Sequence, residues 1–218
     1  MNALRMTEAQ RLEQITKIER GYWKNGAVIA GMDEVGRGPL AGPVVVAAVI
    51  LPPQPLIHGV KDSKLIASET RREELAARIR EQAIAVGIGV VPREIIDEIN
   101  ILQATRRAFC MAFENLPVKP DHALVDALKD LGLSACEHAL IHGDALSYLI
   151  GAASIVAKVH RDRMMREYHA FYPQYGFERN KGYGTAEHIA ALREYGPCPL
   201  HRKTFIKKIL EDGHERTG

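Results

Sequence analysis

The sequence has little cysteine, and this scarcity excludes two classes of small scaffold. Its three cysteines, Cys110, Cys136 and Cys198, are an odd number and lie far apart in a chain of 218 residues. A disulfide framework needs an even set of cysteines, and a structural zinc site needs four Cys or His ligands at short spacings. We therefore expect reduced thiols. The 46% of hydrophobic residues is typical of an ordinary globular protein.

The sequence also has no long apolar run. The longest candidate, from Pro39 to Pro53, is interrupted by Gly42 and Pro43 and is shorter than the roughly 18 residues that a membrane helix needs. The N-terminus mixes acidic and basic residues, with no apolar block behind a basic start, so no secretory signal is predicted. We expect a cytoplasmic protein that does not bind membranes.

The chain has almost no net charge, but its charges are unevenly placed. It carries 29 Lys+Arg against 27 Asp+Glu, a net charge of +2. Residues 158–208 hold 11 Lys+Arg and only 5 Asp+Glu, a local excess of 11 − 5 = +6, and aromatic residues are interleaved with them. Such a segment can bind a polyanion. Composition alone favours the alternative, a solvated helical face beside core aromatics.

Apolar periodicity predicts strands and helices in a definite order. We expect strands at residues 27–32, 44–51, 83–91, 122–125 and 139–141. We expect helices at residues 4–20, after Ser68, from Pro92 to Leu116, and at 147–170, 185–195 and 204–210. This order predicts an α/β layer fold with a mixed sheet. We divide the chain into an N-terminal helical extension outside the main fold (1–26), a core (27–170) and a C-terminal helical lobe packed on the core (171–218).

Four carboxylates stand where predicted strands give way to loops: Asp33, Glu34, Asp126 and Asp144. Strand ends are where α/β folds place their sites. Four acids at one place repel one another unless cations lie between them, and oxygen ligands suit Mg²⁺ or Mn²⁺. Two such ions are a known apparatus for phosphodiester displacement. Taken singly, each acid is more often a turn or capping residue, so the hypothesis depends on the set.

A second candidate feature, Gly36-Arg37-Gly38, follows the first two acids directly. Two glycines allow backbone amides to point at a ligand and a sugar to approach the chain closely, and Arg37 is a candidate for a phosphate. The alternative is a tight turn with an exposed arginine. The spacing fits neither a P-loop nor a dinucleotide fingerprint. Lys64 is a further candidate for the same crevice, whereas Ser63 has no histidine partner for nucleophilic catalysis.

Cysteine and histidine also occur twice at short spacing. Cys198 and His201 are three residues apart, which provides too few ligands for a zinc site. Cys136, His138 and His142 alternate at strand spacing, which places them on one face of a strand. We interpret them as partly buried side chains.

Several motifs together resemble the type 2 ribonucleases H, the bacterial ribonuclease HII family. The first and most specific is the stretch from Asp33 to Val45, DEVGRGPLAGPVV. Others follow in the same order: Asp62-Ser63-Lys64-Leu65, Val125-Asp126, Gly143-Asp144-Ala145, residues 152–158 with Arg161-Asp162, Lys181-Gly182-Tyr183-Gly184-Thr185 and His201-Arg202-Lys203-Thr204-Phe205. The resemblance covers about residues 28–206.

The resemblance implies a ribonuclease H-like fold with a five-stranded mixed sheet. It implies hydrolysis of the RNA strand of RNA/DNA hybrids, and cleavage 5′ of ribonucleotides embedded in duplex DNA that leaves a 3′-hydroxyl and a 5′-phosphate. Carried over by motif, the metal ligands and catalytic residues are Asp33, Glu34, Asp126 and Asp144, with two ions of Mg²⁺ or Mn²⁺. The segment Gly36-Arg37-Gly38 would contact the 2′-hydroxyl and a neighbouring phosphate, and Tyr183 would lie against the sugar on the 3′ side.

Two departures and two alternatives stay open. His142 stands where we expect lysine in many relatives, so a fixed positive charge becomes one that depends on pH. The first 26 residues lie outside the resemblance.

A non-catalytic hybrid-binding module of the same fold is the main alternative, although acids in a phosphate groove repel the ligand unless metals are bound. A nucleotide-binding switch lacks its other motifs. We expect a monomer.

Overall fold

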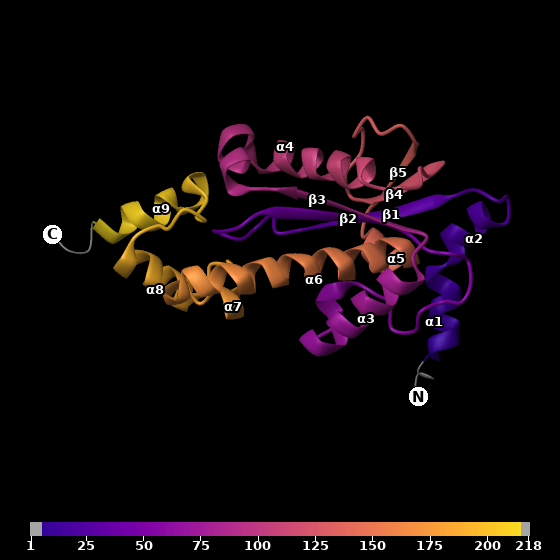
Figure 1. Ribbon diagram of the computed structural model, residues 1–218, viewed down its shortest axis with the longest axis horizontal. Coiled ribbons are helices and arrows are strands. Elements are labelled where there is room, and N and C mark those ends of the chain that lie inside the picture. The colour runs from indigo at the N-terminus through magenta and orange to yellow at the C-terminus, as the bar shows by residue number, and fades with distance from the viewer. Residues whose placement is uncertain (1–5, 215–218) are drawn as a thin grey trace, which may run out of the picture.

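The β-branched runs of the sequence form one five-stranded sheet with helices on both faces (Figure 1). The computed structural model describes residues 6–214. Helix α4 covers one face, and α3, α5 and α6 cover the other, so the fold has three layers (Figure 1). The α/β fold with a mixed sheet is confirmed. Within residues 6–214, no helix is both long enough and apolar enough to cross a membrane.

The sheet has the strand order β3-β2-β1-β4-β5. The strands are β1 (Ile29–Val35), β2 (Val44–Ile50), β3 (Ala85–Val91), β4 (His122–Asp126) and β5 (Cys136–Leu140). The pairs β1–β2 and β2–β3 are antiparallel, whereas β4 runs parallel to β1 and to β5. The carboxyl ends of β1, β4 and β5 therefore meet at one end of the sheet.

Several of the helices begin at a capping Ser or Thr side chain. The helices are α1 (Glu8–Ile15), α2 (Lys17–Trp23), α3 (Glu69–Gln82), α4 (Arg93–Glu114), α5 (Gly143–Leu146), α6 (Tyr148–Phe171), α7 (Phe177–Asn180), α8 (Ala186–Tyr195) and α9 (Lys203–His214), with 3₁₀ turns η1 (Ser63–Leu65) and η2 (Pro173–Tyr175). The side chains of Ser68, Ser147 and Thr185 each accept a hydrogen bond from the backbone N–H three residues on. These caps fix the starts of α3, α6 and α8.

The fifth strand differs from its prediction. The apolar run at 139–141 predicts a strand there, but β5 is Cys136–Leu140, so Asp144 does not follow the strand and lies in α5. An edge strand pairs through its backbone and leaves its side chains half exposed, so its polar residues do not give the apolar pattern that marks inner strands.

The N-terminal extension packs into the core, which corrects the prediction that it lies outside the main fold. Thr7 caps α1 through a capping box, but the single helix predicted at residues 4–20 breaks at Thr16 and continues as α2. Leu12 is buried in the cluster between the sheet and α6. Glu19 is fully buried, and its Oε1 accepts hydrogen bonds from Ser147 Oγ at 2.5 Å and from Leu149 N at 3.1 Å. The extension therefore holds the start of α6.

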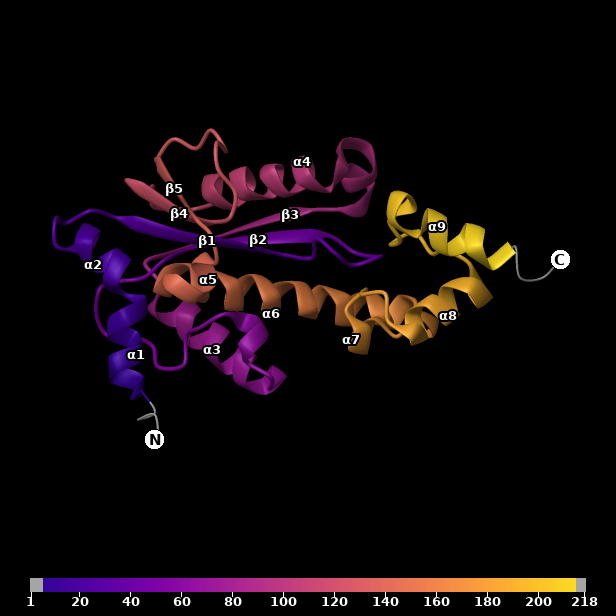
Figure 2. The same cartoon turned by 180° about the vertical axis from the view of Figure 1, so that it is seen from behind.

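The C-terminal helices pack at the far end of α6, where it extends beyond the sheet (Figure 2). One cluster joins Phe177 and Ala191 of this lobe to Met165 of α6 and to Ala41, and a second joins Leu192 to Leu40. Because both small cores include residues of the β1–β2 loop, we propose that the lobe is a subdomain that depends on the core. The division into 1–26, 27–170 and 171–218 remains a proposal, and residues 1–5 and 215–218 lie outside the described part.

We predict that Glu19→Ala lowers the free energy of unfolding by about 2–4 kcal/mol, because it deletes two buried hydrogen bonds and leaves a cavity. Urea denaturation followed by circular dichroism measures this change. The exposed Glu13 of α1 provides the control, and Glu13→Ala should change the unfolding free energy by less than about 0.5 kcal/mol. Equal losses in the two variants would contradict the anchoring role of Glu19.

A carboxylate cluster beside a glycine-rich loop

Three of the four predicted acids come together at the ends of two neighbouring parallel strands. Asp33 and Glu34 lie near the end of β1, and Asp126 ends β4. Because Met32 pairs with Val125, the acids Asp33 and Asp126 follow in adjacent positions. One carboxylate oxygen from each of the three residues lies within 4.8 Å of the others. The topology thus creates the cluster that the strand-end pattern predicts.

The three carboxylates are electrostatically strained. Burial, followed by the neighbouring charge of Glu34, raises the pKa of Asp33 well above its usual value. Burial likewise raises the pKa of Glu34, against the opposing effect of Arg37. The pKa of Asp126 is raised by burial and by the charge of Asp144. Negative charges gathered in a poorly solvated place are the arrangement that a bound cation stabilises.

The donor atoms fit a hard divalent cation. Backbone amides already satisfy one oxygen each of Asp33 and Asp126, through Glu34 N and Gly143 N, both at 2.8 Å. Glu34 Oε2 is buried and has no hydrogen-bond partner among the described residues. An unpartnered buried carboxylate oxygen beside two further carboxylates is a set of oxygen ligands such as Mg²⁺ and Mn²⁺ prefer.

Asp144 borders this cluster without joining it. It is buried in α5, and its nearest cation is Lys64 of η1, whose Nζ lies 3.6 Å from Asp144 Oδ2. Burial lowers the pKa of Lys64, but Asp62, Asp144 and the more distant acids outweigh this effect and raise it. His142, exposed in the left-handed conformation before α5, lowers the pKa of Asp126 when it is charged. The side chains of Lys64 and His142 thus flank the acids.

A buried arginine holds the glycine-rich loop after β1. This residue, Arg202, directly precedes α9. Arg202 donates to the carbonyls of Gly36 at 2.6 Å and Arg37 at 2.9 Å, and to that of Gly42 at 2.9 Å. Burial lowers the pKa of Arg202 to about 9, and the charge of Arg161 contributes, yet the guanidinium stays charged at neutral pH. The three carbonyls therefore take the place of a carboxylate partner.

A second buried arginine joins this loop to the loop that carries Tyr183. Arg161 of α6 donates to the carbonyls of Pro43 at 2.9 Å, Ala41 at 3.1 Å and Lys181 at 2.8 Å. Gly36 has φ +95°, and a methyl group there would overlap the Arg161 side chain. Glycine is therefore required at this position both for its backbone conformation and for space.

Gly38 and Tyr183 lie next to each other on an open face of the glycine-rich loop. A methyl group on Gly38 would have only the Tyr183 ring within 4 Å, at 3.9 Å. The Tyr183 side chain is 41% exposed, and its loop is fixed by a hydrogen bond from Leu40 N to Gly182 O at 2.8 Å. Arg37 lies on the same loop, with its Nη1 3.3 Å from Glu34 Oε1. Arg37 and Lys64 thus contact acidic side chains, whereas Tyr183 lies next to Gly38 on the loop that follows Glu34.

The sequence pattern did not identify Arg161 and Arg202 as residues that position the site. Both occur inside the quoted motifs, but an arginine in a basic segment reads as a surface charge. Each stands in a short run of charged and polar residues, HRDR at 160–163 and HRK at 201–203, so the local sequence carries no signal that it is buried. Their function depends on carbonyl groups more than 100 positions away along the chain.

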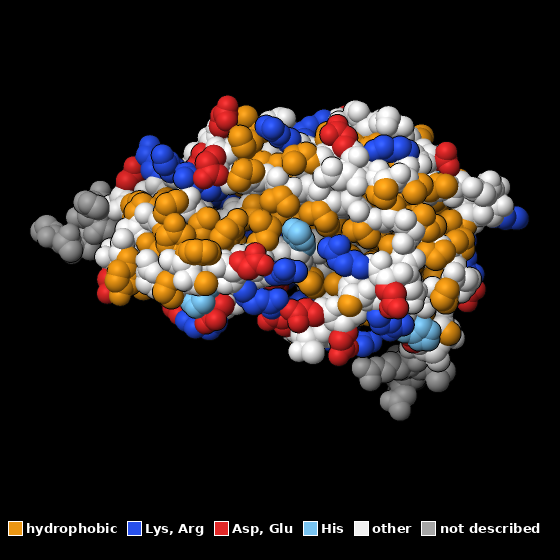
Figure 3. All heavy atoms as spheres, in the orientation of Figure 1, with side chains coloured by type: hydrophobic (Ala, Val, Ile, Leu, Met, Phe, Trp, Pro, Cys, Tyr) orange, Lys and Arg blue, Asp and Glu red, His pale blue; other side chains and the backbone are white. Residues whose placement is uncertain are grey.

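Much of the local positive excess is neutralised within the fold. Over α3, α6 and α7, Lys and Arg side chains are intermingled with Asp and Glu (Figure 3). Arg166 of α6 contacts Glu69 at 2.5 Å and Glu73 at 2.6 Å, and Lys158 contacts Asp162 at 2.7 Å. Arg161 and Arg202 are buried. The local excess of positive charge counted in the sequence is therefore partly balanced or buried in the fold.

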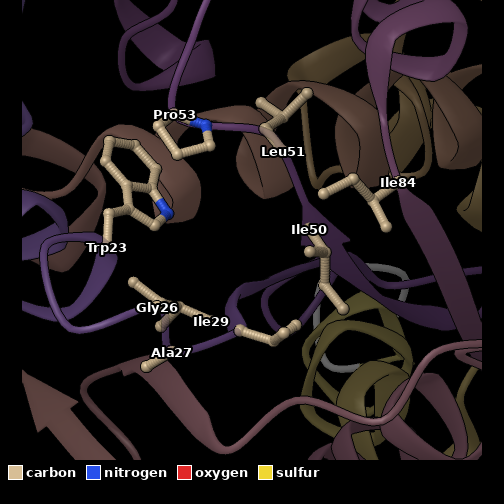
Figure 4. Close-up of a pocket in the computed structure, with 9 residues that line it drawn as sticks. Trp23, Gly26, Ala27, Ile29, Ile50, Leu51, Pro53 and Ile84 are labelled. Carbon is tan, nitrogen blue, oxygen red and sulfur yellow. The ribbon is translucent and has the colours of Figure 1, made fainter.

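An apolar hollow lies at the other end of β1, away from the acids (Figure 4). Trp23 and Pro53 stand on one side of it and Ile29, Ile50 and Ile84 on the other (Figure 4). Its lining contains no carboxylate, lysine, arginine or histidine. The hollow thus lacks the oxygen ligands and charged side chains that the carboxylate cluster brings together.

Comparison with known proteins gives one consistent family. The family Ribonuclease HII matches residues 30–208. The chain is 50% identical over 205 residues to Ribonuclease HII of Caldanaerobacter subterraneus subsp. tengcongensis, covering 94% of this chain and 85% of that protein. It is 52% identical over 208 residues to Ribonuclease HII of Bacillus cytotoxicus, covering 94% and 80%. The crystal structure of ribonuclease H2 from Pyrococcus horikoshii OT3 is similar with a TM-score of 0.71 and 29% identity, covering 86% of this chain and 99% of that one.

We predict that Asp33→Asn stabilises the metal-free protein at pH 8. A raised carboxyl pKa means that the folded state retains a proton that the unfolded chain has lost. Stability therefore falls as pH rises from about 3.8, the ordinary value, through the raised pKa, and the full penalty is present above it. Removing the charge should raise Tm by about 2–4 °C, equivalent to ~1 kcal/mol.

The measurement is Tm by circular dichroism in buffer with a chelator, at pH 8 and at pH 4. The difference between Asp33→Asn and the wild type should shrink at pH 4, where the wild-type carboxyl is also protonated. A lower Tm for the variant at pH 8 would mean that the Asp33 charge is paired and stabilising.

Proposed function

We propose that the carboxylate cluster is the catalytic centre of this chain, which belongs to the ribonuclease HII family of endoribonucleases acting on RNA/DNA hybrids. We propose that it also cuts 5′ of ribonucleotides embedded in duplex DNA and leaves a 3′-hydroxyl and a 5′-phosphate. The single observation that supports this most directly is the meeting of Asp33, Glu34 and Asp126 within 4.8 Å, beside a loop whose backbone is open to a sugar.

The acids are proposed to hold two ions of Mg²⁺ or Mn²⁺. Asp33, Glu34 and Asp126 supply oxygen ligands, and Asp144 supplies a fourth carboxylate next to Asp126. When bound, divalent ions supply the positive charge that activates water and stabilises the phosphorane-like charge at the scissile phosphate. The buried, unpartnered Glu34 Oε2 supports this role, because it is an available ligand atom.

The loop residues are proposed to recognise the ribonucleotide. At Gly38 the backbone has no side chain and open space beside it, so a ribose can approach and its 2′-hydroxyl can meet the main chain. Arg37 and Lys64 are exposed cations beside the acids and can bind phosphates. The half-exposed Tyr183 ring offers a flat surface for the sugar on the 3′ side.

This proposal predicts that Asp126→Asn folds but loses about 10²–10⁴-fold in cleavage rate, since the amide keeps the size of the side chain and removes a metal-binding charge. The assay uses one DNA duplex with a single ribonucleotide and one uniform hybrid, each with and without Mg²⁺. Asp130→Asn in the exposed loop after β4 is the matched control and should cleave like the wild type.

The assay also separates the alternatives. Binding of the hybrid without Mg²⁺-dependent cleavage by the wild type would favour the non-catalytic hybrid-binding module. Wild-type turnover by Asp126→Asn in saturating Mg²⁺ would remove Asp126 from the centre. The monomeric state expected from the sequence stays a prediction.

We further predict that Gly38→Ala lowers cleavage by roughly 10- to 100-fold with little change in Tm, because the new methyl group projects into open space where the sugar must approach. Gly36→Ala is the contrast, since its positive φ and the overlap with Arg161 should lower Tm as well. Cleavage rates and thermal unfolding of both variants decide the matter. Parallel losses of Tm in both would make Gly38 a structural glycine only.

A further inference from the structure

A second cluster of ligating side chains lies at the opposite end of β4 from the acids. His122 is the first residue of β4 and pairs in register with Cys136 of β5. Because side chains alternate along a strand, His138 lies on the same face as Cys136. One ligand atom of each of the three residues lies within 4.8 Å of the others. Among residues 6–214, this cluster and the carboxylate cluster are the two groups of this kind.

The sequence pattern predicted two members of this cluster and named a wrong third residue. It correctly placed Cys136 and His138 on one face of a strand. His142 does not join them, because β5 ends at Leu140 and His142 precedes α5 in a left-handed conformation. His122, from the neighbouring strand, takes its place. The prediction of partial burial holds for His138 and is wrong for Cys136 and His142, which are exposed. The contact between the imidazoles of His122 and His138 was not predicted.

The spacing of the ligand atoms suits a tetrahedral ion. His122 Nδ1 and His138 Nε2 are 3.1 Å apart. Around zinc, with bonds of about 2.0–2.1 Å to nitrogen and 2.3 Å to sulfur, neighbouring ligand atoms lie about 3.3–3.6 Å apart. The two imidazoles therefore need to separate by only a few tenths of an ångström. The exposed Cys136 side chain is free to turn its sulfur toward them.

The two imidazoles are also held in place by their contacts. The hydrogen bond between the rings requires that at least one of the facing nitrogens has a free lone pair. Tyr22 of α2 packs on both rings, with centroids 4.6 Å from His122 and 5.4 Å from His138.

We propose that His122, Cys136 and His138 form a binding site for a borderline-soft divalent transition ion, with Zn²⁺ as the representative. Two nitrogens and a thiolate select such ions over Mg²⁺, whereas the all-oxygen carboxylate cluster has the opposite preference. The exposed side of Cys136 leaves a fourth position open to solvent. A bound ion joins the edge strand β5 to β4 through side chains, beneath the cover that α2 provides.

The test uses Co²⁺ as the probe, added to chelator-treated full-length protein in the presence of excess Mg²⁺. Thiolate ligation produces a near-ultraviolet charge-transfer band, and tetrahedral Co²⁺ gives intense visible bands. Cobalt held only by carboxylates gives no charge-transfer band. We expect one equivalent of Co²⁺ per chain to give both features, and Zn²⁺ to abolish them by displacement.

Two variants and one control make the result specific. Cys136→Ser should abolish the charge-transfer band, and His138→Gln should weaken Zn²⁺ binding by more than the roughly 10- to 100-fold that loss of an outer-shell partner costs. Cys198→Ser is the control, because Cys198 lies beside the other histidine pair, His188 and His201, whose Nε2 atoms are 3.0 Å apart. Circular dichroism confirms that each variant is folded.

The proposal is overturned if the wild type shows no charge-transfer band with one equivalent of Co²⁺. It is equally overturned if Cys136→Ser retains the band, or if Cys198→Ser loses it. None of these spectra depends on the nuclease assay, so this site and the proposed function can fail separately.

Discussion

The candidate site depends on two buried guanidinium groups that bind backbone carbonyls in place of carboxylates. Arg202 fixes the loop at Gly36, Arg37 and Gly42, and Arg161 ties the same loop to Lys181. A buried charge without compensating hydrogen bonds is very costly, so these carbonyls must stay where the two arginines need them. The loop that lies beside the acids is thus held in one shape by contacts from α6 and from the segment before α9. A residue of the C-terminal lobe, Arg202, therefore helps to hold the loop that follows the acids of β1.

The second constraint concerns buried negative charge: the acids are held close together in the fold. Asp33, Glu34 and Asp126 are held together by the sheet although burial and mutual repulsion oppose their charges. The strand pairing of β1 with β4 is rigid enough to hold them, and the amides of Glu34 and Gly143 relieve part of the strain. Such stored electrostatic strain is what makes a cation bind strongly, and a site without it would bind a hard ion weakly.

The two ends of β4 differ in chemistry because they differ in neighbours. At its carboxyl end Asp126 meets the acids of β1, and at its amino end His122 meets the thiol and imidazole of the edge strand β5. The N-terminal helices reach this second end, where Tyr22 packs on the histidines, and they reach the start of α6 through Glu19. The N-terminal helices therefore contact both the histidines of β4 and β5 and the start of α6 through buried or half-buried side chains.

Local features follow from the amino-acid sequence alone. Helix caps such as Ser68, Ser147 and Thr185 act on amides three residues away, and the apolar runs of β1, β2 and β3 follow from side-chain alternation and burial. The strand-end acids and the glycines after β1 were visible for the same reason. Four other features come from tertiary contacts: Glu19 is buried, β5 begins at Cys136, His122 lies beside Cys136, and Arg161 and Arg202 hold the loop. Each of these depends on pairing between segments distant in sequence, whose geometry no local pattern encodes.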